Sequence, residues 1–221
     1  MTFSASKCLL AAAALAGAAL SFTASAACSK PRYPEESLRQ REEGVAIVAF
    51  LVHADGTVER SVVLVSTGFP ALDRKTQDAL SKCPFKPATE NGKPVEVWQP
   101  VQYFWTLDDD PDMVRAKHVA AEAAREGDVN ALYRLSILLN AVPKSDTDRE
   151  KAAVLLRSAA ERGAAAAQYE LGRRYEKGDK IEANLEEAMR WYEKAAAQGD
   201  VLAIQRLRMG DLTDQAQVFI R

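Results

Sequence analysis

The sequence predicts an α+β protein in which a small ββαβ domain with an antiparallel sheet precedes an all-α helical-repeat solenoid. Two observations indicate this fold class. In the N-terminal half, two runs rich in β-branched residues flank an Asp-Gly dipeptide, which is typical of a β-hairpin. In the C-terminal half, glycine, alanine and leucine positions recur with a period of 36 residues, which is typical of stacked helical repeats.

The first 26 residues have the pattern of a secretory signal peptide. Lys7 is their only charged residue, an apolar run follows at residues 9–20, and Ala24-Ser25-Ala26 is a small-x-small cleavage signal. The apolar run is shorter than the about 20 residues that a membrane-spanning helix needs. We therefore expect cleavage after Ala26 and export. An uncleaved anchor and a lipoprotein acylated at Cys28 are the alternatives.

Removal of the signal peptide leaves two cysteines, Cys28 and Cys83. An even number of cysteines in an exported protein favours a disulfide. This bond would attach the N-terminal arm to the end of the first helix, and loop closure would stabilise the fold by roughly 3–5 kcal/mol. Two unbridged buried thiols are the alternative.

The predicted hairpin has a first strand at residues 45–52, a turn at Asp55-Gly56 and a return strand at residues 58–65. The first strand is apolar on both faces. One face holds Val45, Ile47, Ala49 and Leu51, and the other holds Ala46, Val48, Phe50 and Val52. An amphipathic helix that begins at Pro70 and ends before Pro84 can cover only one face. The N-terminal arm, the C-terminal half or a second copy of the chain must cover the other.

A third strand is expected at residues 95–107. It contains Pro100, which cannot donate a hydrogen bond to a ladder and therefore indicates an edge strand or a bulge. An edge strand can accept a strand from a partner, although Pro100 also limits unwanted pairing. We expect the aromatic residues of this strand to lie in the core. The candidate partner-binding residues are Val97, Gln99, Val101 and Tyr103.

Residues 30–107 contain the motifs Tyr33-Pro34, Asp55-Gly56-Thr57-Val58, Cys83-Pro84-Phe85 and Pro100-Val101-Gln102-Tyr103-Phe104. In this order, these motifs resemble the TonB C-terminal domain. The resemblance implies a periplasmic αβ domain. In energy-transducing members, this domain binds the TonB box of outer-membrane receptors by strand addition.

The chain also departs from the energy transducers of that family. Residues 30–44 are short and charged, whereas a transducer has a long Pro-rich linker that crosses the periplasm. Leu38 stands where transducers can carry a glutamine that contacts the receptor. These departures argue against energy transduction.

Residues 108–112 form an acidic stretch that we interpret as a solvated linker rather than a calcium loop, because its acidic residues do not alternate. Beyond it, Gly127, Gly163 and Gly199 recur every 36 residues and are expected to end helices. The pattern predicts helices at residues 128–140, 148–161, 164–176 and 185–198. Such an array is near the minimum size for a stable solenoid and needs a neighbour, so we expect it to pack on the second face of the sheet.

The repeat motifs are similar to the Sel1 repeat, a relative of the tetratricopeptide repeat. The similarity rests on residues 167–178 and 188–199, and the unit that begins at Ala131 is a weaker copy. It implies a protein–protein interaction scaffold. The candidate groove residues are Tyr133, Tyr169 and Tyr192, and burial between helices is the alternative role for these tyrosines.

The sequence offers no clear catalytic or metal-binding pattern. His53 and His118 have no neighbouring ligands at metal spacing, and there is no phosphate-binding glycine loop, nucleophile elbow or Cys-x-x-Cys. We therefore expect no cofactor and no enzymatic activity. A β-lactam-binding Sel1-like enzyme is only a remote alternative, because such proteins carry a cysteine pair in each repeat and residues 113–209 contain no cysteine. A net charge of −2 argues against nucleic acid.

These observations predict a non-catalytic periplasmic protein with a signal peptide (1–26), a TonB C-terminal-like domain (27–107), a linker (108–112), Sel1-like repeats (113–209) and a tail (210–221). Its expected partners are envelope proteins, bound by strand addition or in the helical groove, and a homodimer is left open. The main alternative is a TonB-type energy transducer with an uncleaved N-terminal anchor. The apolar residues of the tail, Val218, Phe219 and Ile220, could cap the last helix, and a frayed end is the alternative.

Overall fold

The structure is a computed structural model that describes residues 30–209 and the strand at residues 218–220. The signal sequence and Cys28 lie outside the described residues, so the predictions about cleavage and the disulfide are not tested by it. Within the described ranges, no helix is both long and apolar enough to cross a membrane.

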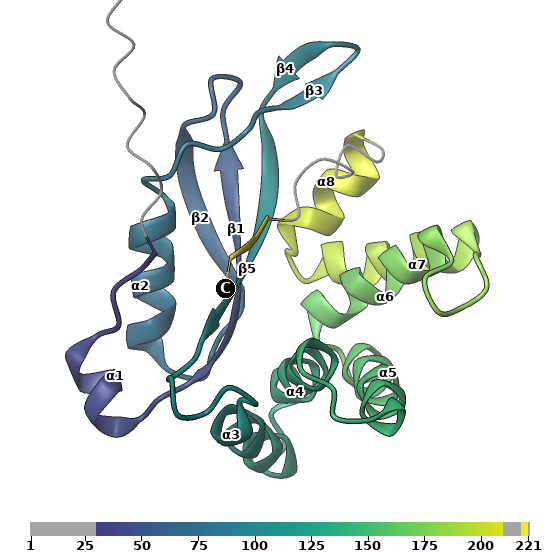
Figure 1. Cartoon of the computed structure of the whole chain (residues 1–221). Helices are drawn as coiled ribbons and strands as arrows, with labels where there is room; N and C mark the ends of the chain where they lie inside the picture. The colour runs from purple at the N-terminus through teal and green to yellow at the C-terminus, as the bar shows by residue number, and fades with distance from the viewer. Residues whose placement is uncertain (1–29, 210–217, 221) are drawn as a thin grey trace, which may run out of the picture.

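The N-terminal half folds around β1 (Gly44–Val52). β1 pairs antiparallel with β2 (Val58–Val65) on one side and with β5 (Val97–Trp105) on the other. A short strand, β6 (Val218–Ile220), adds to β5 in parallel, so the sheet order is β2-β1-β5-β6 (Figure 1). The antiparallel ββαβ core was predicted, and the parallel fourth strand was not.

The turn between β1 and β2 depends on Gly56. Its φ is 87°, and a Cβ at this position would lie 2.4 Å from the carbonyl oxygen of Phe85. Asp55 Oδ1 also accepts a hydrogen bond from the Thr57 backbone N–H at 2.9 Å. The Asp-Gly pair therefore makes the predicted hairpin turn and admits a close approach of the following loop.

Helix α2 (Pro70–Leu80) covers one face of the sheet. Leu72 and Leu80 are buried there against the even-numbered side chains of β1: Ala46, Val48, Phe50 and Val52. Trp105 from β5 joins this core, and its indole N–H donates to Thr76 Oγ1 at 2.9 Å. Two further elements were not predicted: α1 (Glu35–Gln40) and the small hairpin of β3 (Ala88–Glu90) and β4 (Lys93–Val95).

The C-terminal half is helical, as predicted. Its helices are α3 (Val114–Arg125), α4 (Val129–Ala141), α5 (Asp146–Glu161), α6 (Ala165–Lys177), α7 (Leu185–Ala197) and α8 (Val201–Met209). The pairs α4–α5 and α6–α7 are the two repeat units. Gly127, Gly163 and Gly199 have φ values of 103°, 100° and 86° at the expected helix ends.

These helices cover the second face of the sheet (Figure 1). Val45 and Phe104 share a core with α3, α4 and α6, and Ala49 shares another with Tyr169 and Leu202. The sequence left open whether the N-terminal arm, the C-terminal half or a second copy of the chain covers this face. In the structure, the C-terminal half covers it. The expected packing of repeats on sheet is confirmed.

The acidic stretch between the two halves is not simply a solvated linker, and that prediction is wrong for Asp110. Only 5% of Asp110 is exposed, because its carboxylate accepts hydrogen bonds from the backbone N–H groups of Val114 and Arg115 at the start of α3. Arg115 in turn binds the buried Glu43 side chain through two nitrogens, at 3.0 and 3.1 Å. The stretch thus connects α3 to the start of β1.

Candidate functional site

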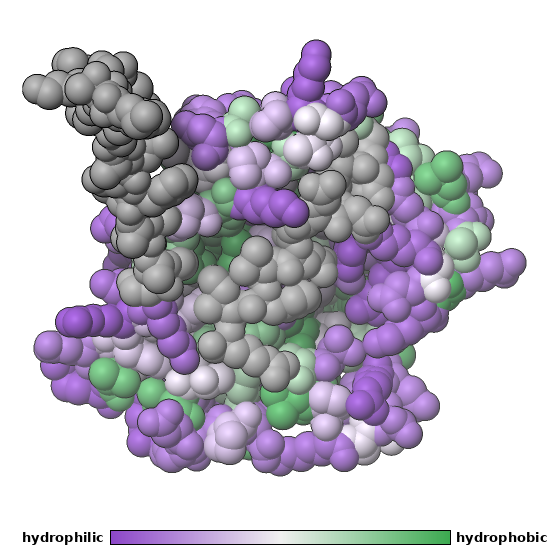
Figure 2. All heavy atoms as spheres, turned by 45° about the horizontal axis from the view of Figure 1, so that its top comes forward, coloured by the Kyte–Doolittle hydropathy of each residue, from purple (hydrophilic) through white to green (hydrophobic). Residues whose placement is uncertain are grey.

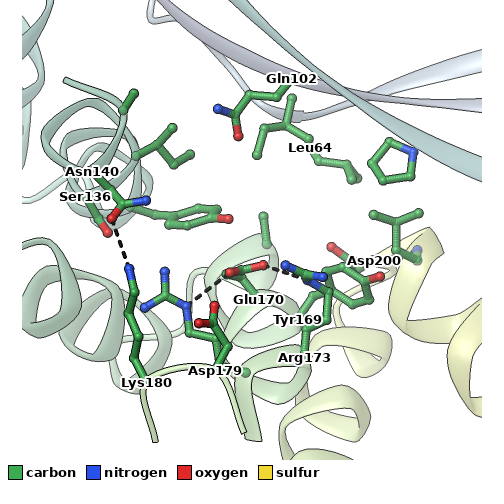
Figure 3. Close-up of a pocket in the computed structure, with 18 of the residues that line it drawn as sticks. Leu64, Gln102, Ser136, Asn140, Tyr169, Glu170, Arg173, Asp179, Lys180 and Asp200 are labelled. Carbon is green, nitrogen blue, oxygen red and sulfur yellow. Dashed lines mark hydrogen bonds and ion pairs between the residues drawn. The ribbon is translucent and has the colours of Figure 1, made fainter. Parts of the chain in front are cut away.

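A cleft of about 520 Å³ lies between the sheet and the repeats. Ile47, Leu64 and Gln102 line it from the sheet, and Tyr133 and Tyr169 line it from α4 and α6 (Figure 3). On the face shown in Figure 2, the surface is mainly polar, with apolar residues exposed at several places among the polar ones. The cleft therefore has an apolar wall from one half and a mixed wall from the other.

The helical wall carries most of the charge. Glu170 accepts from Arg173 Nε at 3.0 Å and from Arg174 Nε at 3.1 Å, so one carboxylate is shared by two guanidinium groups (Figure 3). Lys180 Nζ lies 3.4 Å from Asn140 Oδ1 at the rim. At this end of the cleft, Arg173, Arg174 and Lys180 outnumber Glu170 and Asp179, which favours an acidic group there. With Asp200 included, the whole lining carries three groups of each sign.

Asp200 lines the opposite end of the cleft, where it begins α8. Its Oδ1 accepts hydrogen bonds from the backbone N–H groups of Leu202 and Ala203, at 3.0 and 2.9 Å. Burial nevertheless raises the pKa of Asp200 to about 6. This carboxyl can therefore change charge in mildly acidic conditions.

The outer edge of β5 forms a second candidate surface. Gln205 from α8 binds the backbone of Trp98 twice: its Oε1 accepts from the Trp98 N–H at 2.6 Å, and its Nε2 donates to the Trp98 carbonyl at 3.1 Å. Further along the strand, Val101 to Tyr103 pair with β6. β5 is therefore covered along much of the edge that the sequence predicts to be exposed.

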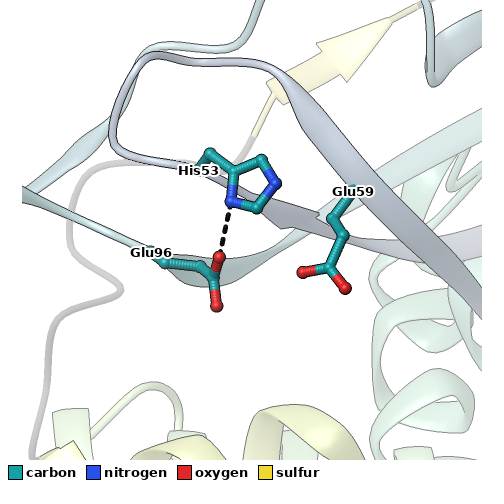
Figure 4. A group of neighbouring side chains, drawn as sticks. All are labelled: His53, Glu59 and Glu96. Atoms are coloured by element: carbon teal, nitrogen blue, oxygen red, sulfur yellow. Dashed lines mark hydrogen bonds and ion pairs between the residues drawn. The ribbon is translucent and has the colours of Figure 1, made fainter.

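A third group consists of His53, Glu59 and Glu96 (Figure 4). One ligand atom from each residue lies within 4.8 Å of the others. His53 Nδ1 and Glu96 Oε2 are 2.5 Å apart, and both side chains are more than two-fifths exposed. An imidazole and two carboxylates are a donor set that a divalent metal can use, and sequence spacing did not indicate this grouping.

Two family models match the chain in the order that the fold predicts. The model described as Gram-negative bacterial TonB protein C-terminal matches residues 29–105, and the Sel1 repeat model matches residues 129–163 and 165–200. The chain therefore contains a TonB C-terminal domain followed by two Sel1 repeats. The first repeat is α4–α5 and the second is α6–α7, and the second ends at Asp200 in the cleft.

Two curated relatives are similar to parts of the chain. Chitin synthase regulator SKT5 of Saccharomyces cerevisiae is 40% identical over 96 residues, which are 42% of this chain and 14% of that protein. DAP3-binding cell death enhancer 1 of Rattus norvegicus is 36% identical over 99 residues, which are 45% of this chain and 19% of that protein. The chain thus spans less than a fifth of the length of these curated relatives.

Solved structures of repeat proteins are also similar. A Sel1 repeat protein from Oxalobacter formigenes is 30% identical, with 46% of this chain and 81% of that chain covered and a TM-score of 0.36. The protective antigen c5321 of uropathogenic Escherichia coli is 30% identical, with 44% and 22% covered and a TM-score of 0.36. The TonB C-terminal domain and the Sel1 repeats together support a protein-interaction scaffold.

The candidate partner-binding residues of the third strand lie on β5 of the TonB C-terminal domain, but they are not accessible to a partner. The side chains of Val97, Gln99, Val101 and Tyr103 are all at least 97% buried. The prediction of an open edge strand is wrong where β6 pairs with β5, because that edge is already occupied. The aromatic residues Tyr103 and Trp105 lie in the core, as expected.

The three candidate tyrosines of the Sel1 repeats have different positions. Tyr133 and Tyr169 line the cleft, although each is less than 10% exposed. Tyr192 is buried behind Tyr169, with ring centroids 5.6 Å apart, and its hydroxyl donates to Glu176 at 2.7 Å. The structure therefore brings two of the three together at the site.

Sequence reasoning missed Gln205, Gln102, Arg173 and Asp200. The repeat period places Arg173 on a helix and Asp200 directly after the Gly199 helix end, but it does not show that these helices face a sheet. Gln205 and Trp98 are separated by 107 positions, and no local pattern connects them. These residues become a site only through the packing of one module on the other.

Proposed function

We propose that this chain is a non-catalytic periplasmic protein that binds a segment of an envelope protein in the cleft between its TonB C-terminal domain and its Sel1 repeats. One observation carries the proposal: both modules line the cleft, so a partner would contact both at once. A segment with apolar side chains would pack on Leu64 and Ile47.

The chemistry of the helical wall narrows the kind of segment. Arg173 and Arg174 both bind the single carboxylate of Glu170 through their Nε atoms. A carboxylate of the partner could therefore bind the other nitrogens of these two guanidinium groups, next to the apolar surface. Tyr133 and Tyr169 present aromatic surface with little loss of side-chain freedom. We therefore propose a peptide segment that combines an acidic residue with apolar ones.

The test is site-specific photocrosslinking in the periplasm. A photoreactive residue at Asn140, on the rim of the cleft, is expected to capture a partner, whereas one at Val154, which is 69% exposed on α5 and is absent from the cleft lining, is not. Arg173→Glu is expected to lower the yield at position 140. Equal capture at both positions, or capture at position 154 alone, would contradict the proposal.

The proposed location and the competing function are tested together by the mass of the mature protein. A chain that begins at Ala27 has lost its signal peptide and has no anchor through which to receive force. A chain that retains residues 1–26 in the membrane would instead favour the TonB-type energy transducer. The short segment at residues 30–44, with only Pro31 and Pro34, supports the first outcome.

A further inference from the structure

The group of His53, Glu59 and Glu96 is assembled from three neighbouring strands, at the end of the sheet that carries the β1–β2 turn. His53 directly follows β1, and Glu96 directly precedes β5. Val52 is aligned with Val97, so the next position outward on each strand places the imidazole beside the carboxylate. Their contact, from Nδ1 to Oε2, is 2.5 Å long. Two of the three side chains are therefore positioned by the β1–β5 ladder.

Glu59 joins them because of an irregularity in β2. Ser61 faces α2, where its Oγ accepts a hydrogen bond from Gln77 Nε2 at 3.1 Å. In a regular strand, residue 59 would point to that same face. β2 has one residue more than β1 at this point, and Glu59 is the residue without an aligned partner. Such a bulge re-aims side chains: Val58 packs into the core under α2, and Glu59 instead joins His53 (Figure 4).

The two carboxylates of this group are not neutralised by a basic side chain. In the part of the chain that the structure describes, neither Glu59 nor Glu96 forms an ion pair with a lysine or an arginine. Arg60, which follows Glu59 directly, lies over the Trp98 ring instead, with its Cζ 5.3 Å from the ring centroid. Two anionic groups this close to each other repel. A bound dication would remove this repulsion.

We propose that His53, Glu59 and Glu96 bind one divalent transition-metal ion, of which zinc fits best. Zinc accepts imidazole nitrogen and carboxylate oxygen at about 2.0–2.2 Å, and tetrahedral coordination separates its ligand atoms by roughly 3.4 Å. One ligand atom from each residue already lies within 4.8 Å of the others. The side chains of His53 and Glu96 are more than two-fifths exposed, so their rotation can close the remaining distance. Water would take the fourth position.

The donor set also distinguishes zinc from the hard cations. Calcium and magnesium prefer oxygen ligands only, whereas one of the three donors here is an imidazole nitrogen. A bound zinc ion would join the end of β1 to β2 and to the start of β5, and so stabilise this end of the sheet. None of the three residues lines the cleft, so this site is separate from the one proposed to bind a protein segment.

Isothermal titration calorimetry of the untagged chain, first stripped of metal by a chelator, tests the proposal with zinc chloride as the probe. We expect one equivalent of zinc to bind, with calcium unable to compete at equal concentration. His53→Ala, Glu59→Gln and Glu96→Gln are each expected to weaken zinc binding by roughly tenfold or more, because even the loss of an outer-shell group costs about that much.

Glu90→Gln is the matched control. It removes one negative charge from an exposed position on β3 of the same domain, outside the group. Zinc binding is expected to stay unchanged in this variant.

A second measurement needs no variant. Cobalt(II) added in place of zinc is expected to shift or broaden the backbone amide signals of residues 53, 59 and 96 before those of other residues, because a paramagnetic ion acts on the nuclei nearest to it.

Three results would overturn the proposal: no zinc binding to the unchanged chain, zinc binding that survives in all three variants, or an equal loss in Glu90→Gln. The first amide signals affected by cobalt lying elsewhere in the chain would overturn it as well. Glu59→Gln is expected to leave photocrosslinking at position 140 unchanged, so the failure of this proposal and the failure of the proposed function can be told apart.

Discussion

At the scale of single residues, Asp200 caps α8 although burial disfavours the charged form of its carboxylate. The carboxylate accepts two backbone hydrogen bonds at the start of α8, but it lies in a site where only 5% of the residue is exposed. Burial outweighs the two hydrogen bonds, and the pKa of Asp200 rises to about 6. The folded chain therefore binds a proton here more readily than the unfolded chain does.

We predict that Asp200→Asn stabilises the protein at pH 8 and changes its pH dependence. Because the folded pKa is higher than the unfolded one, protonation of Asp200 favours folding below pH 4, and this advantage is lost as the pH rises through 6. A shift of roughly two pKa units corresponds to about 3 kcal/mol. The amide oxygen of asparagine can still cap α8.

Urea unfolding at pH 4 and pH 8 measures this effect. The difference in unfolding free energy between the two pH values is expected to shrink in Asp200→Asn relative to the unchanged chain. If the variant is less stable than the unchanged chain at pH 8, the account of Asp200 as a strained cap is wrong.

The contact between Arg115 and Glu43 is a second effect at this scale. The Glu43 side chain is fully buried and holds both Arg115 and the Leu107 backbone N–H, the latter at 2.6 Å. We predict that Arg115→Ala lowers the thermal midpoint by several degrees, because the buried carboxylate loses its charged partner. Differential scanning calorimetry measures this change.

Arg41→Ala is the matched control for that measurement. Arg41 also contacts an acidic residue of the linker, Asp109, but both side chains are at least half exposed. An exposed ion pair contributes little to stability. A loss in Arg41→Ala as large as that in Arg115→Ala would contradict the role assigned to Glu43.

At the scale of elements, the two repeat units differ where their helices approach. Gly172 in α6 lies against α7, and a Cβ there would be 2.9 Å from the Tyr192 ring and 3.0 Å from the Ala188 carbonyl oxygen. The equivalent position of the first repeat is Ser136, whose hydroxyl donates to the Ala152 carbonyl at 2.6 Å. Position 172, between α6 and α7, therefore cannot accept a side chain unless its neighbours move, whereas position 136, between α4 and α5, already carries one.

We predict that Gly172→Ala destabilises the protein by about 1–3 kcal/mol, because Tyr192 or α7 must move. Chemical denaturation measures this change. Ser136→Ala is the control, because it keeps the Cβ and loses one hydrogen bond, which costs about 1 kcal/mol. An unchanged stability in Gly172→Ala would show that α6 and α7 are less closely packed than described.

The elements that could be predicted from sequence are those with a strong local signal. The alternation of side chains in β1 correctly assigned Ala46 and Val48 to the face that α2 covers, and Val45 and Ala49 to the opposite face, which the repeats cover. The glycine period likewise located the ends of the repeat helices. Both signals arise within one element, where periodicity and backbone geometry act together.

The elements that could not be predicted depend on partners far away in sequence. β6 has only three residues, and its pairing with β5 joins positions more than 100 residues apart. For the tail residues Val218, Phe219 and Ile220 the sequence left open a cap on the last helix or a frayed end, and the structure instead assigns them to the sheet. Short strands carry little periodicity, so only the tertiary arrangement identifies them.

At the scale of the whole molecule, each module supplies what the other lacks. The sheet has an apolar face that α2 does not cover, and two repeat units are near the minimum for a stable solenoid. The shared cores of α3, α4 and α6 with Val45 and Phe104 bury both surfaces. The cleft arises because this packing is incomplete between Ile47, Leu64 and the helical wall.

We predict that residues 30–107 alone do not behave as a well-folded monomer. Without the repeats, Val45, Ala49 and Phe104 face water, and an apolar area of this kind promotes self-association. Analytical ultracentrifugation with a hydrophobic dye-binding assay is the measurement. If the fragment is monomeric and binds no dye, the exposed face of the sheet is not apolar enough to explain why the repeats pack on it.

The shared cores pack the TonB C-terminal domain and the Sel1 repeats into one rigid body. Nitrogen-15 relaxation of the chain from residue 27 onwards measures a rotational correlation time for each half. We expect one common value, set by the mass of the whole chain. Two shorter and different values, each matching a separate half, would show that the halves tumble independently and that the shared cores do not hold them together.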